Sequence, residues 1–261
     1  MRWHVKSRLS QENMSINAQG LSDVGLSRSH NEDCFHIDAE RSVFLVADGM
    51  GGHGHGEVAS RLAIEATVGY VQEVLDGEPS SDNDRPPTAA TTMSAAVRAA
   101  HRRVVSAVED DQTLLGMGTT VVGLMMTENV ATVAYVGDSR AYLLRDGGLD
   151  LVTDDHTWVN EQVKAGYLTS EQARTHPLKS VVTRAVGGDH EVEVDVIEVD
   201  IQKGDLFLLC SDGLTSMLDD NEIRELLVDA DDLGTCCQKL VDAANDHGGV
   251  DNVTVILIRS V

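Results

Sequence analysis

Short runs of apolar residues, bounded by Gly, Asp and Asn, recur along the chain. Runs of this length are typical of buried β-strands. They predict strands at Val43–Ala47, Thr119–Met126, Ala131–Val136, Ala141–Leu144, Val192–Val199, Leu206–Cys210 and Val253–Ile258, with a short one at Phe35–Ile37. The gaps at Glu128-Asn129 and Gly137-Asp138 each predict a hairpin turn.

Four longer segments repeat their apolar residues at helical spacing. They predict helices at Glu57–Leu75, Thr88–Val108, Asn221–Asp229 and Leu233–Asn245, with a loop at Gly77–Pro87 between the first two. Strands and helices do not alternate one by one, so the pattern favours an α+β fold. We expect antiparallel sheets with helices grouped on the outside.

One polar segment, Asp154–Gly188, interrupts the series of strands. It contains two short helical patterns, at Val159–Ala165 and Ser170–Thr175, and we interpret it as a flap over a site. Residues 1–13 have no apolar pattern and are expected to form a flexible tail. Residues 14–261 are then expected to form a single domain.

Composition and charge exclude several classes of partner. The chain has 261 residues, 42% of them hydrophobic, and a formal charge of -23. An acidic chain is unsuited to nucleic acid or to anionic membrane surfaces. No apolar run is long enough to span a bilayer, and no secretory signal precedes the first strand. The four cysteines form no Cys-x-x-Cys pair, which favours a reducing, cytoplasmic location. No apolar stripe requires a dimer, so we expect a monomer.

Acidic residues recur where the predicted strands begin or end. Asp48, Asp138 and Asp212 follow apolar strands, whereas Asp33 and Asp251 precede them. A single Asp-Gly after a strand is ordinary turn chemistry. Five such residues could converge at one end of the sheets, where they would repel one another unless cations were bound. Oxygen ligands suit Mg²⁺ or Mn²⁺, so the pattern favours a metal site.

A competing motif is present after the first predicted strand. Residues 49–54 match the glycine pattern G-x-G-x-x-G of dinucleotide-binding proteins. However, Asp48 would place a carboxylate beside the pyrophosphate, and a second long helix follows where a strand is expected. A dinucleotide-binding oxidoreductase also leaves the other aspartates unexplained.

Six motifs in order resemble the metal-dependent protein phosphatases of type 2C, the serine/threonine family, and its compact bacterial members. They are Arg28-Ser-His-Asn-Glu32-Asp33, Val46-Ala-Asp48-Gly49-Met-Gly-Gly-His53, Gly118-Thr119-Thr120, Val136-Gly-Asp138-Ser-Arg140, Ser211-Asp212-Gly213-Leu214 and Gly249-Val-Asp251-Asn252-Val-Thr254. The resemblance spans Gly20 to Ile258. It implies a four-layer α-β-β-α sandwich, in which helix pairs flank two antiparallel sheets.

The resemblance also implies roles for individual residues and a cofactor of two core Mn²⁺ or Mg²⁺ ions with a weaker third. Asp48 would bridge the two core metals, the Gly49 carbonyl would bind one, and Asp212 and Asp251 the other. The remaining residues would be Asp138 for the third metal, Glu32 and Asp33 for orienting water, and Arg28 for gripping the substrate phosphate.

The function implied by the resemblance is hydrolysis of phosphoserine and phosphothreonine on proteins by direct attack of metal-activated water. The partners would be phosphorylated proteins, including serine/threonine kinases and their targets, whose signalling the enzyme would reverse. The alternative is a non-catalytic, phosphatase-like metal-binding regulatory module, although every expected ligand position is filled.

The general acid is left open by the sequence. Met50 stands where some relatives have a histidine. His53, His55 or His156 could substitute for it, or a metal-bound water could protonate the leaving group.

Overall fold

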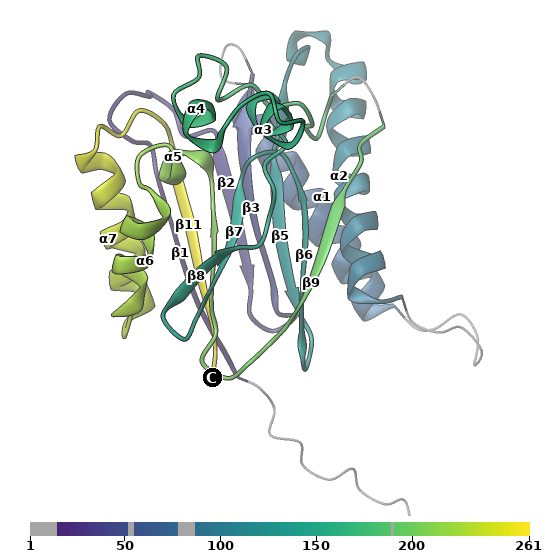
Figure 1. Ribbon diagram of the computed structural model, residues 1–261. Helices are drawn as coiled ribbons and strands as arrows, with labels where there is room; N and C mark the ends of the chain where they lie inside the picture. Colours follow the sequence, from purple (N-terminus) through teal and green to yellow (C-terminus); the bar gives the residue numbers. More distant parts are fainter. Residues whose placement is uncertain (1–14, 52–54, 78–86, 189–190) are drawn as a thin grey trace, which may run out of the picture.

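The computed structural model describes residues 15–51, 55–77, 87–188 and 191–261. Two antiparallel sheets lie face to face, and a pair of long helices covers the outer face of each (Figure 1). The predicted α+β class and the four-layer α-β-β-α sandwich are therefore confirmed. The expected tail of residues 1–13 and most of the loop at Gly77–Pro87 lie outside the described residues.

The two sheets contain strands from distant parts of the chain. The first sheet has the order β1-β11-β10-β7-β8, with β1 Ile16–Asp23, β11 Val253–Ser260, β10 Leu206–Cys210, β7 Arg140–Arg145 and β8 Gly148–Leu151. The second has the order β2-β3-β5-β6-β9, with β2 Asp33–Asp38, β3 Val43–Met50, β5 Val121–Met126, β6 Val130–Val136, β9 Asp195–Asp200 and, paired with the end of β3, β4 Gly118–Thr119.

The helices lie close to their predicted ranges. The long ones are α1 Gly56–Asp76 and α2 Ala89–Asp110 against the second sheet, and α6 Asp220–Val228 and α7 Leu233–Asp246 against the first. Short helices α3 Trp158–Lys164, α4 Ser170–Arg174 and α5 Asp212–Thr215 gather at one end of the sandwich (Figure 1), and a 3-10 turn spans Gln112–Leu114. Among the described residues, no helix has the length and apolar character that crossing a bilayer requires.

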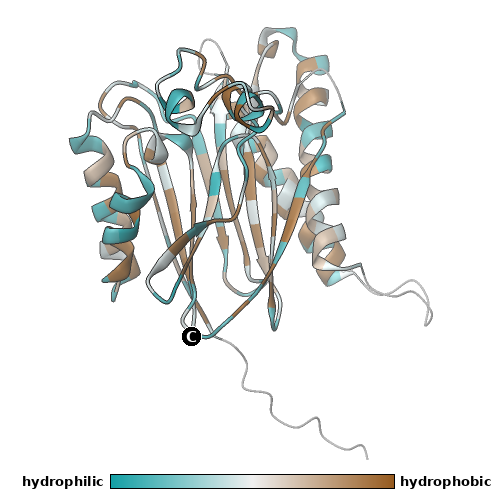
Figure 2. Cartoon of the chain, viewed as in Figure 1, coloured by the Kyte–Doolittle hydropathy of each residue, from teal (hydrophilic) through white to brown (hydrophobic). Residues whose placement is uncertain are grey.

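Alternating side chains of the central strands fill different layers of the core. Phe207 and Leu209 of β10 point between the sheets, where they meet Phe44 of β3, while Leu208 points toward α6 and α7. Leu45 of β3 packs under α1 and α2. A strand buried on both faces has a continuous apolar sequence, which explains why these strands could be predicted (Figure 2).

The predicted hairpin at Gly137-Asp138 is wrong. β6 pairs with β5 and β9 in one sheet, whereas β7 pairs with β8 and β10 in the other. Gly137 has φ of +109° and lies against Thr120, so the chain leaves one sheet here and enters the other. The hairpin at Glu128-Asn129, by contrast, is confirmed, because β5 and β6 are paired neighbours.

Other differences from the prediction concern strands with weak patterns. β1 and β8 were not predicted, because β1 is mostly polar or small and β8 is short. The predicted strand Thr119–Met126 is broken at Thr120 into β4 and β5. The predicted strand Val192–Val199 enters the sheet only from Asp195, because Val192 packs toward the helix layer and its carbonyl accepts a hydrogen bond from Arg98 of α2.

The flap Asp154–Gly188 contains the two short helices that the sequence predicts, α3 and α4. A single bridge joins Thr157 to Val182 within the flap, and a second joins Val186, near the end of the flap, to Thr119 of β4. The second bridge attaches the flap directly to the strand that pairs with the end of β3. At the start of the flap, the His156 N–H donates to the Gly137 carbonyl over 3.0 Å. The flap therefore starts and ends beside strand ends that carry the acidic motifs.

We predict that Gly137→Ala destabilises the protein more than Gly147→Ala. Both glycines have positive φ, but a Cβ at Gly137 would lie 2.5 Å from Thr120 Cγ2, whereas one at Gly147 would meet nothing within 4 Å. Gly147→Ala is the control, and its free energy of unfolding should fall by about 1 kcal/mol from backbone strain alone. Gly137→Ala should lose roughly 2–4 kcal/mol, because steric overlap adds to that strain. Urea unfolding measures both. Equal losses would show that the crossover does not depend on contact with Thr120.

Candidate active site

The end of β3 is held by a pair of threonines. The backbone N–H of Asp48 donates to Thr120 Oγ1 over 3.0 Å, and its carbonyl accepts from Thr120 N and from Thr119 Oγ1. Thr120 Oγ1 also lies 2.7 Å from Ser139 Oγ. The break at Thr120 thus attaches Asp48 to the crossover that carries Asp138.

Asp33 stands directly opposite Asp48 in the β2–β3 ladder. Its Oδ2 accepts a 2.7 Å hydrogen bond from Ser211 Oγ, which in turn accepts one from Thr254 N. Its Oδ1 is buried and has no hydrogen-bond partner among the described residues. Ser211 therefore links the two sheets and leaves one carboxylate oxygen available for another ligand.

Asn252 positions the loop before β2. It is buried, its Oδ1 accepts from Glu32 N at 2.8 Å, and its Nδ2 donates to the carbonyls of Val24 and His30. Arg28 and Glu32 both belong to the segment held in this way. Sequence reasoning assigned no role to Asn252, Thr120 or Ser211, although each lies inside a motif that it identified.

Gly49 permits an unusually close approach of three segments. A Cβ at this position would lie 2.2 Å from the Gly56 carbonyl oxygen and 2.5 Å from that of Glu32. The Gly49 N–H donates to the same Glu32 oxygen over 3.1 Å. No side chain fits here, so the motif glycine is required for α1 to begin beside the end of β3.

The five aspartates of the motifs form one electrostatic site. Burial, and then the neighbouring charges of Asp212 and Asp251, raise the pKa of Asp33 to about 7. Burial and the charge of Asp212 raise the pKa of Asp138 to about 7. Burial raises the pKa of Asp48 well above its usual range, with contributions from Asp33, Asp212 and Asp138. Burial and Asp251 raise the pKa of Asp212. The tertiary structure thus brings together carboxylates from both sheets.

The residues present fit divalent cations. Crowded carboxylates lose their repulsion when a cation neutralises them, and an oxygen-only donor set suits Mg²⁺ or Mn²⁺. The unpartnered Asp33 Oδ1 would remain free to accept a hydrogen bond from a water beside such ions. Among the described residues, no three His, Cys, Asp or Glu side chains already stand as a complete ligand group.

Arg28 lies at the rim of this site. Its Nη2 donates to Asp251 Oδ2 over 2.8 Å, and its side chain is 48% exposed. The structure therefore places the guanidinium beside a carboxylate of the site. Its contact with phosphate stays a prediction.

His156 is engaged in the scaffold. It is buried, its Nδ1 accepts from Gly137 N at 3.1 Å, its Nε2 lies 3.0 Å from Asp195 Oδ2, and its ring stacks on Tyr135. Burial lowers its pKa. Its ring nitrogens hold the crossover before Asp138 and the start of β9, which argues against His156 as general acid.

The other candidates for the general acid lie on the first glycine-rich loop. Met50 ends β3 and pairs with Gly118. His55 directly precedes α1 and makes no side-chain cap there. His53 lies outside the described residues.

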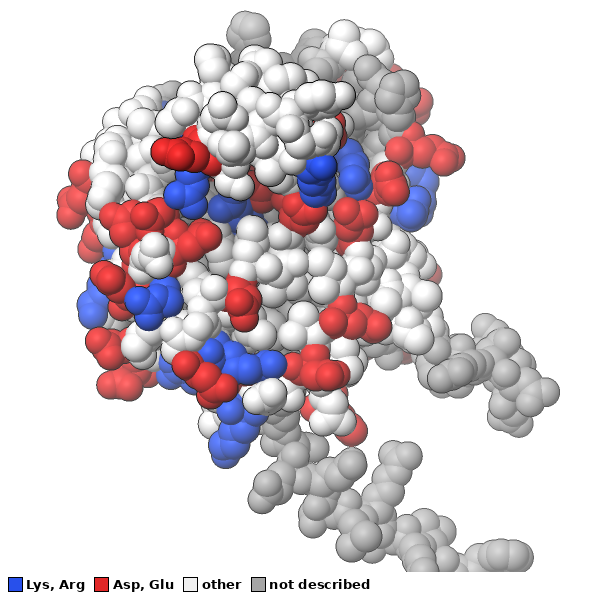
Figure 3. All heavy atoms as spheres, in the orientation of Figure 1, with Lys and Arg blue, Asp and Glu red and all other residues white. Residues whose placement is uncertain are grey.

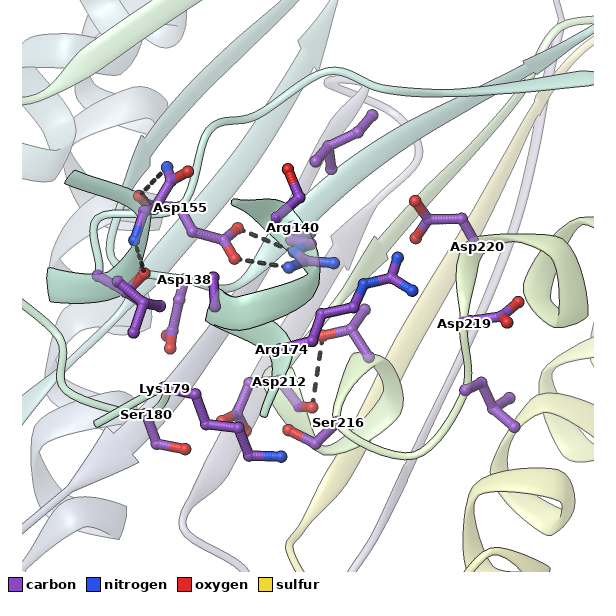
Figure 4. A pocket seen from close by; sticks show the side chains of 18 of the residues that line it. Asp138, Arg140, Asp155, Arg174, Lys179, Ser180, Asp212, Ser216, Asp219 and Asp220 are labelled. Carbon is purple, nitrogen blue, oxygen red and sulfur yellow. Dashed lines mark hydrogen bonds and ion pairs between the residues drawn. The ribbon is translucent and has the colours of Figure 1, made fainter. Parts of the chain in front are cut away.

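A half-buried ion pair anchors the start of the flap. Arg140 of β7 donates from Nε and Nη2 to both carboxylate oxygens of Asp155, at 2.8 and 2.6 Å (Figure 4). Its Nη1 donates to the Tyr142 hydroxyl, which donates to Asp220 at the start of α6. A bidentate pair of this kind fixes orientation as well as distance.

A pocket of about 520 Å³ opens beneath the flap. Its walls come from the flap and from the segment that runs from α5 into α6, and Asp138 and Asp212 line it (Figure 4). The pocket and the carboxylate site therefore share two side chains.

Comparison with known proteins identifies the family. Residues 27–246 match the family described as Protein phosphatase 2C. The chain belongs to the protein phosphatase 2C family. This phosphatase is 35% identical over 247 residues to the serine/threonine phosphatase stp of Listeria monocytogenes, covering 94% of this chain and 96% of that protein.

Solved structures agree with this assignment. The serine/threonine phosphatase PstP/Ppp of Mycobacterium tuberculosis is 38% identical with a TM-score of 0.84, over 94% of this chain and 98% of that one. The catalytic domain of PstP in complex with two manganese ions is 37% identical with a TM-score of 0.82, over 95% and 99% of the two chains.

The predicted family, fold class and enzyme class are thus confirmed. The comparisons support a metal-dependent serine/threonine protein phosphatase and do not favour a non-catalytic module. The dinucleotide-binding alternative is wrong, because the sheets are antiparallel and that fold requires parallel strands.

We predict that, without metal, Asp138→Asn is more stable than the wild-type phosphatase and that this difference grows as the pH rises. Folded Asp138, with a pKa of about 7, keeps its proton at a pH where the unfolded chain has lost it. Its contribution to the unfolding free energy is therefore present below about pH 4 and lost as the pH rises to about 7, by up to about 1.4 kcal/mol per pH unit. Asn cannot ionise, so the advantage of the variant should grow between pH 5 and 7.5.

Urea unfolding in chelator at several pH values measures this difference. Comparing variant with wild type cancels the opposite pH dependence of His101 and His156, whose pKa values burial lowers. Asp231→Asn, at an exposed position between α6 and α7, removes the same charge outside the site and is the matched control. An advantage of Asp138→Asn that does not change with pH would contradict the assigned electrostatics.

Proposed function

We propose that this chain hydrolyses phosphoserine and phosphothreonine on proteins, using Mn²⁺ or Mg²⁺ and direct attack by water. The observation that carries the proposal is the convergence of five aspartates from both sheets at one end of the sandwich. The two manganese ions in the related PstP structure support the choice of metal.

Four residues are proposed to hold the two core ions. Asp48 would bridge them, the Gly49 carbonyl would bind one, and Asp212 and Asp251 would bind the other. Asp138 would hold the weaker third ion. When bound, such ions lower the pKa of water so that hydroxide is available near neutral pH.

The remaining residues bind and orient. Arg28 would exchange its contact with Asp251 for the phosphate of the substrate, because a guanidinium fork binds phosphate and carboxylate oxygens alike. Asp33 would accept a hydrogen bond from water at its free Oδ1, while Ser211 holds its other oxygen. Glu32 would orient water from the segment that Asn252 fixes.

The partners are proposed to be phosphorylated proteins, among them serine/threonine kinases and the proteins that these kinases modify. Residues 14–261 would form one catalytic domain that acts as a monomer. The four free cysteines support a reducing compartment such as the cytoplasm.

We predict that two kinds of site variant differ in kinetic form. Asp48→Asn and Asp251→Asn should abolish turnover of para-nitrophenyl phosphate with Mn²⁺, because they remove metal ligands. Arg28→Ala should mainly raise KM, because it weakens phosphate binding. Asp231→Asn is the matched control. Calorimetric titration with Mn²⁺ completes the test, and equal loss of metal binding in Arg28→Ala and Asp48→Asn would overturn this division of roles.

We also predict that Asp138→Ala retains the two tight Mn²⁺ sites but loses activity on phosphoserine peptides more than on para-nitrophenyl phosphate. If the third ion supports leaving-group protonation, a seryl alkoxide needs that proton far more than an aryl oxide does. A ratio of the two losses of about tenfold is expected, since general acid catalysis contributes at least 10²-fold. Equal losses would remove the acid role, and loss of tight binding would place Asp138 in the core pair.

A further inference from the structure

The pocket beneath the flap contains more charged side chains than the metal site requires. Its acidic lining residues are Asp138, Asp155, Asp212, Asp219, Asp220 and Glu222, and its basic ones are Arg140, Arg174 and Lys179 (Figure 4). Which of these charges face a ligand depends on which are already paired within the protein.

Most of the acids are engaged. Asp155 is held by both arms of Arg140. Asp219 caps α6 by accepting from two backbone N–H groups, Glu222 accepts from the Asp219 N–H, and Asp220 accepts from the Tyr142 hydroxyl. Within the described residues, the pocket acids whose side chains accept no hydrogen bond from an N–H or hydroxyl group are Asp138 and Asp212, which the proposed function assigns to metal ions.

The flap has four Lys and Arg side chains, of which two form ion pairs within the protein and two do not. Lys164 forms an ion pair with Asp154, and Arg184 with Asp195, so these two are neutralised within the protein. Arg174, in the last turn of α4, and Lys179 are exposed. Within the part of the chain that the structure describes, neither side chain forms an ion pair or a hydrogen bond, yet both line the pocket.

The chain has 20 Lys and Arg against 43 Asp and Glu. Other exposed cations, such as Lys203 and Lys239, also lack a partner among the described residues, but they do not line this pocket. Acidic groups are spread over the face shown in Figure 3, with basic groups among them. An excess of acids makes pairing easy, and the other two flap cations are paired. What distinguishes Arg174 and Lys179 is that they line the same pocket as Asp138 and Asp212, so a ligand in this pocket would meet both cations.

We propose that Arg174 and Lys179 form a subsite for an anionic group that flanks the scissile phosphoresidue of the substrate. The inference rests on the proposed function, because it takes Asp138 and Asp212 as the metal-binding end of the same pocket. The flanking group is a side-chain carboxylate or a second phosphate. Both have the oxygen acceptors that guanidinium and ammonium groups bind, and phosphate has the greater charge.

The test is a set of phosphothreonine peptides that are otherwise neutral. One glutamate is moved through the four positions on either side of the phosphothreonine, and kcat/KM is measured with Mn²⁺. We expect one position at which glutamate raises kcat/KM roughly threefold, as exposed ion pairs allow, and a second phosphothreonine there to raise it about tenfold. Comparing these two peptides separates a preference for carboxylate from one for phosphate. The ratio of kcat/KM between acidic and neutral peptides should fall toward one as salt rises from about 0.05 to about 0.5 M.

Charge variants assign the subsite to these two residues. In the double variant Arg174→Gln, Lys179→Gln the ratio of kcat/KM between acidic and neutral peptides should fall to about one. In Arg174→Glu, Lys179→Glu the preference should reverse toward a lysine peptide. The charge-matched control is Lys203→Gln, Lys239→Gln, two exposed positions outside the pocket, which should keep the wild-type ratio.

The outcomes distinguish the two levels of the proposal. Turnover with no preference at any position, or a preference that survives Arg174→Gln, Lys179→Gln, would overturn the subsite and leave the phosphatase function standing. Absence of any turnover would overturn the proposed function. In that case fluorescence anisotropy with the same labelled peptides still measures whether the acidic ones bind more tightly, and equal binding would overturn the subsite as well.

Discussion

Mutual repulsion among Asp33, Asp48, Asp138 and Asp212 is the constraint on which the rest of this structure depends. Burial and neighbouring charge raise the pKa of each of these carboxyl groups, so the folded protein holds them together against an electrostatic cost. That cost is offset by the packed sandwich beneath, whose three aliphatic clusters fill the layers between and outside the sheets. Bound cations would offset the repulsion, because each carboxylate is then attracted to a positive ion that it ligates.

Neutral polar side chains hold this arrangement in place. Thr120 links the end of β3 to the crossover before β7, Ser211 links the two sheets through Asp33, and Asn252 holds the segment that carries Arg28 and Glu32. None of them adds charge to a site that already has too much. Their hydrogen bonds fix backbone positions, so the carboxylates sit on rigid strand ends rather than on free loops.

Some charged side chains around the flap are paired within the protein, and others are left available to a ligand. Arg140 and Asp155 neutralise each other and anchor its start, and His156 holds the neighbouring crossover as a neutral acceptor. Because these groups are satisfied internally, the pocket below the flap is left with two acidic and two basic side chains that lack protein partners among the described residues. In this pocket of about 520 Å³, the paired charges therefore hold the flap in place, and the unpaired ones remain available to a ligand.

The sequence by itself determined the features that local pattern encodes. β3 and β10 are buried on both faces and are continuously apolar, the long helices show helical spacing, and each site aspartate adjoins an apolar strand. Only the tertiary structure decided whether Gly137 turns a hairpin or crosses between sheets, because a glycine with positive φ serves either purpose. It alone revealed β1, whose small and polar residues become a strand by pairing along the whole of β11. It also decided that Lys164 and Arg184 are paired while Arg174 and Lys179 are not, because ion pairs depend on distances between segments that no sequence spacing specifies.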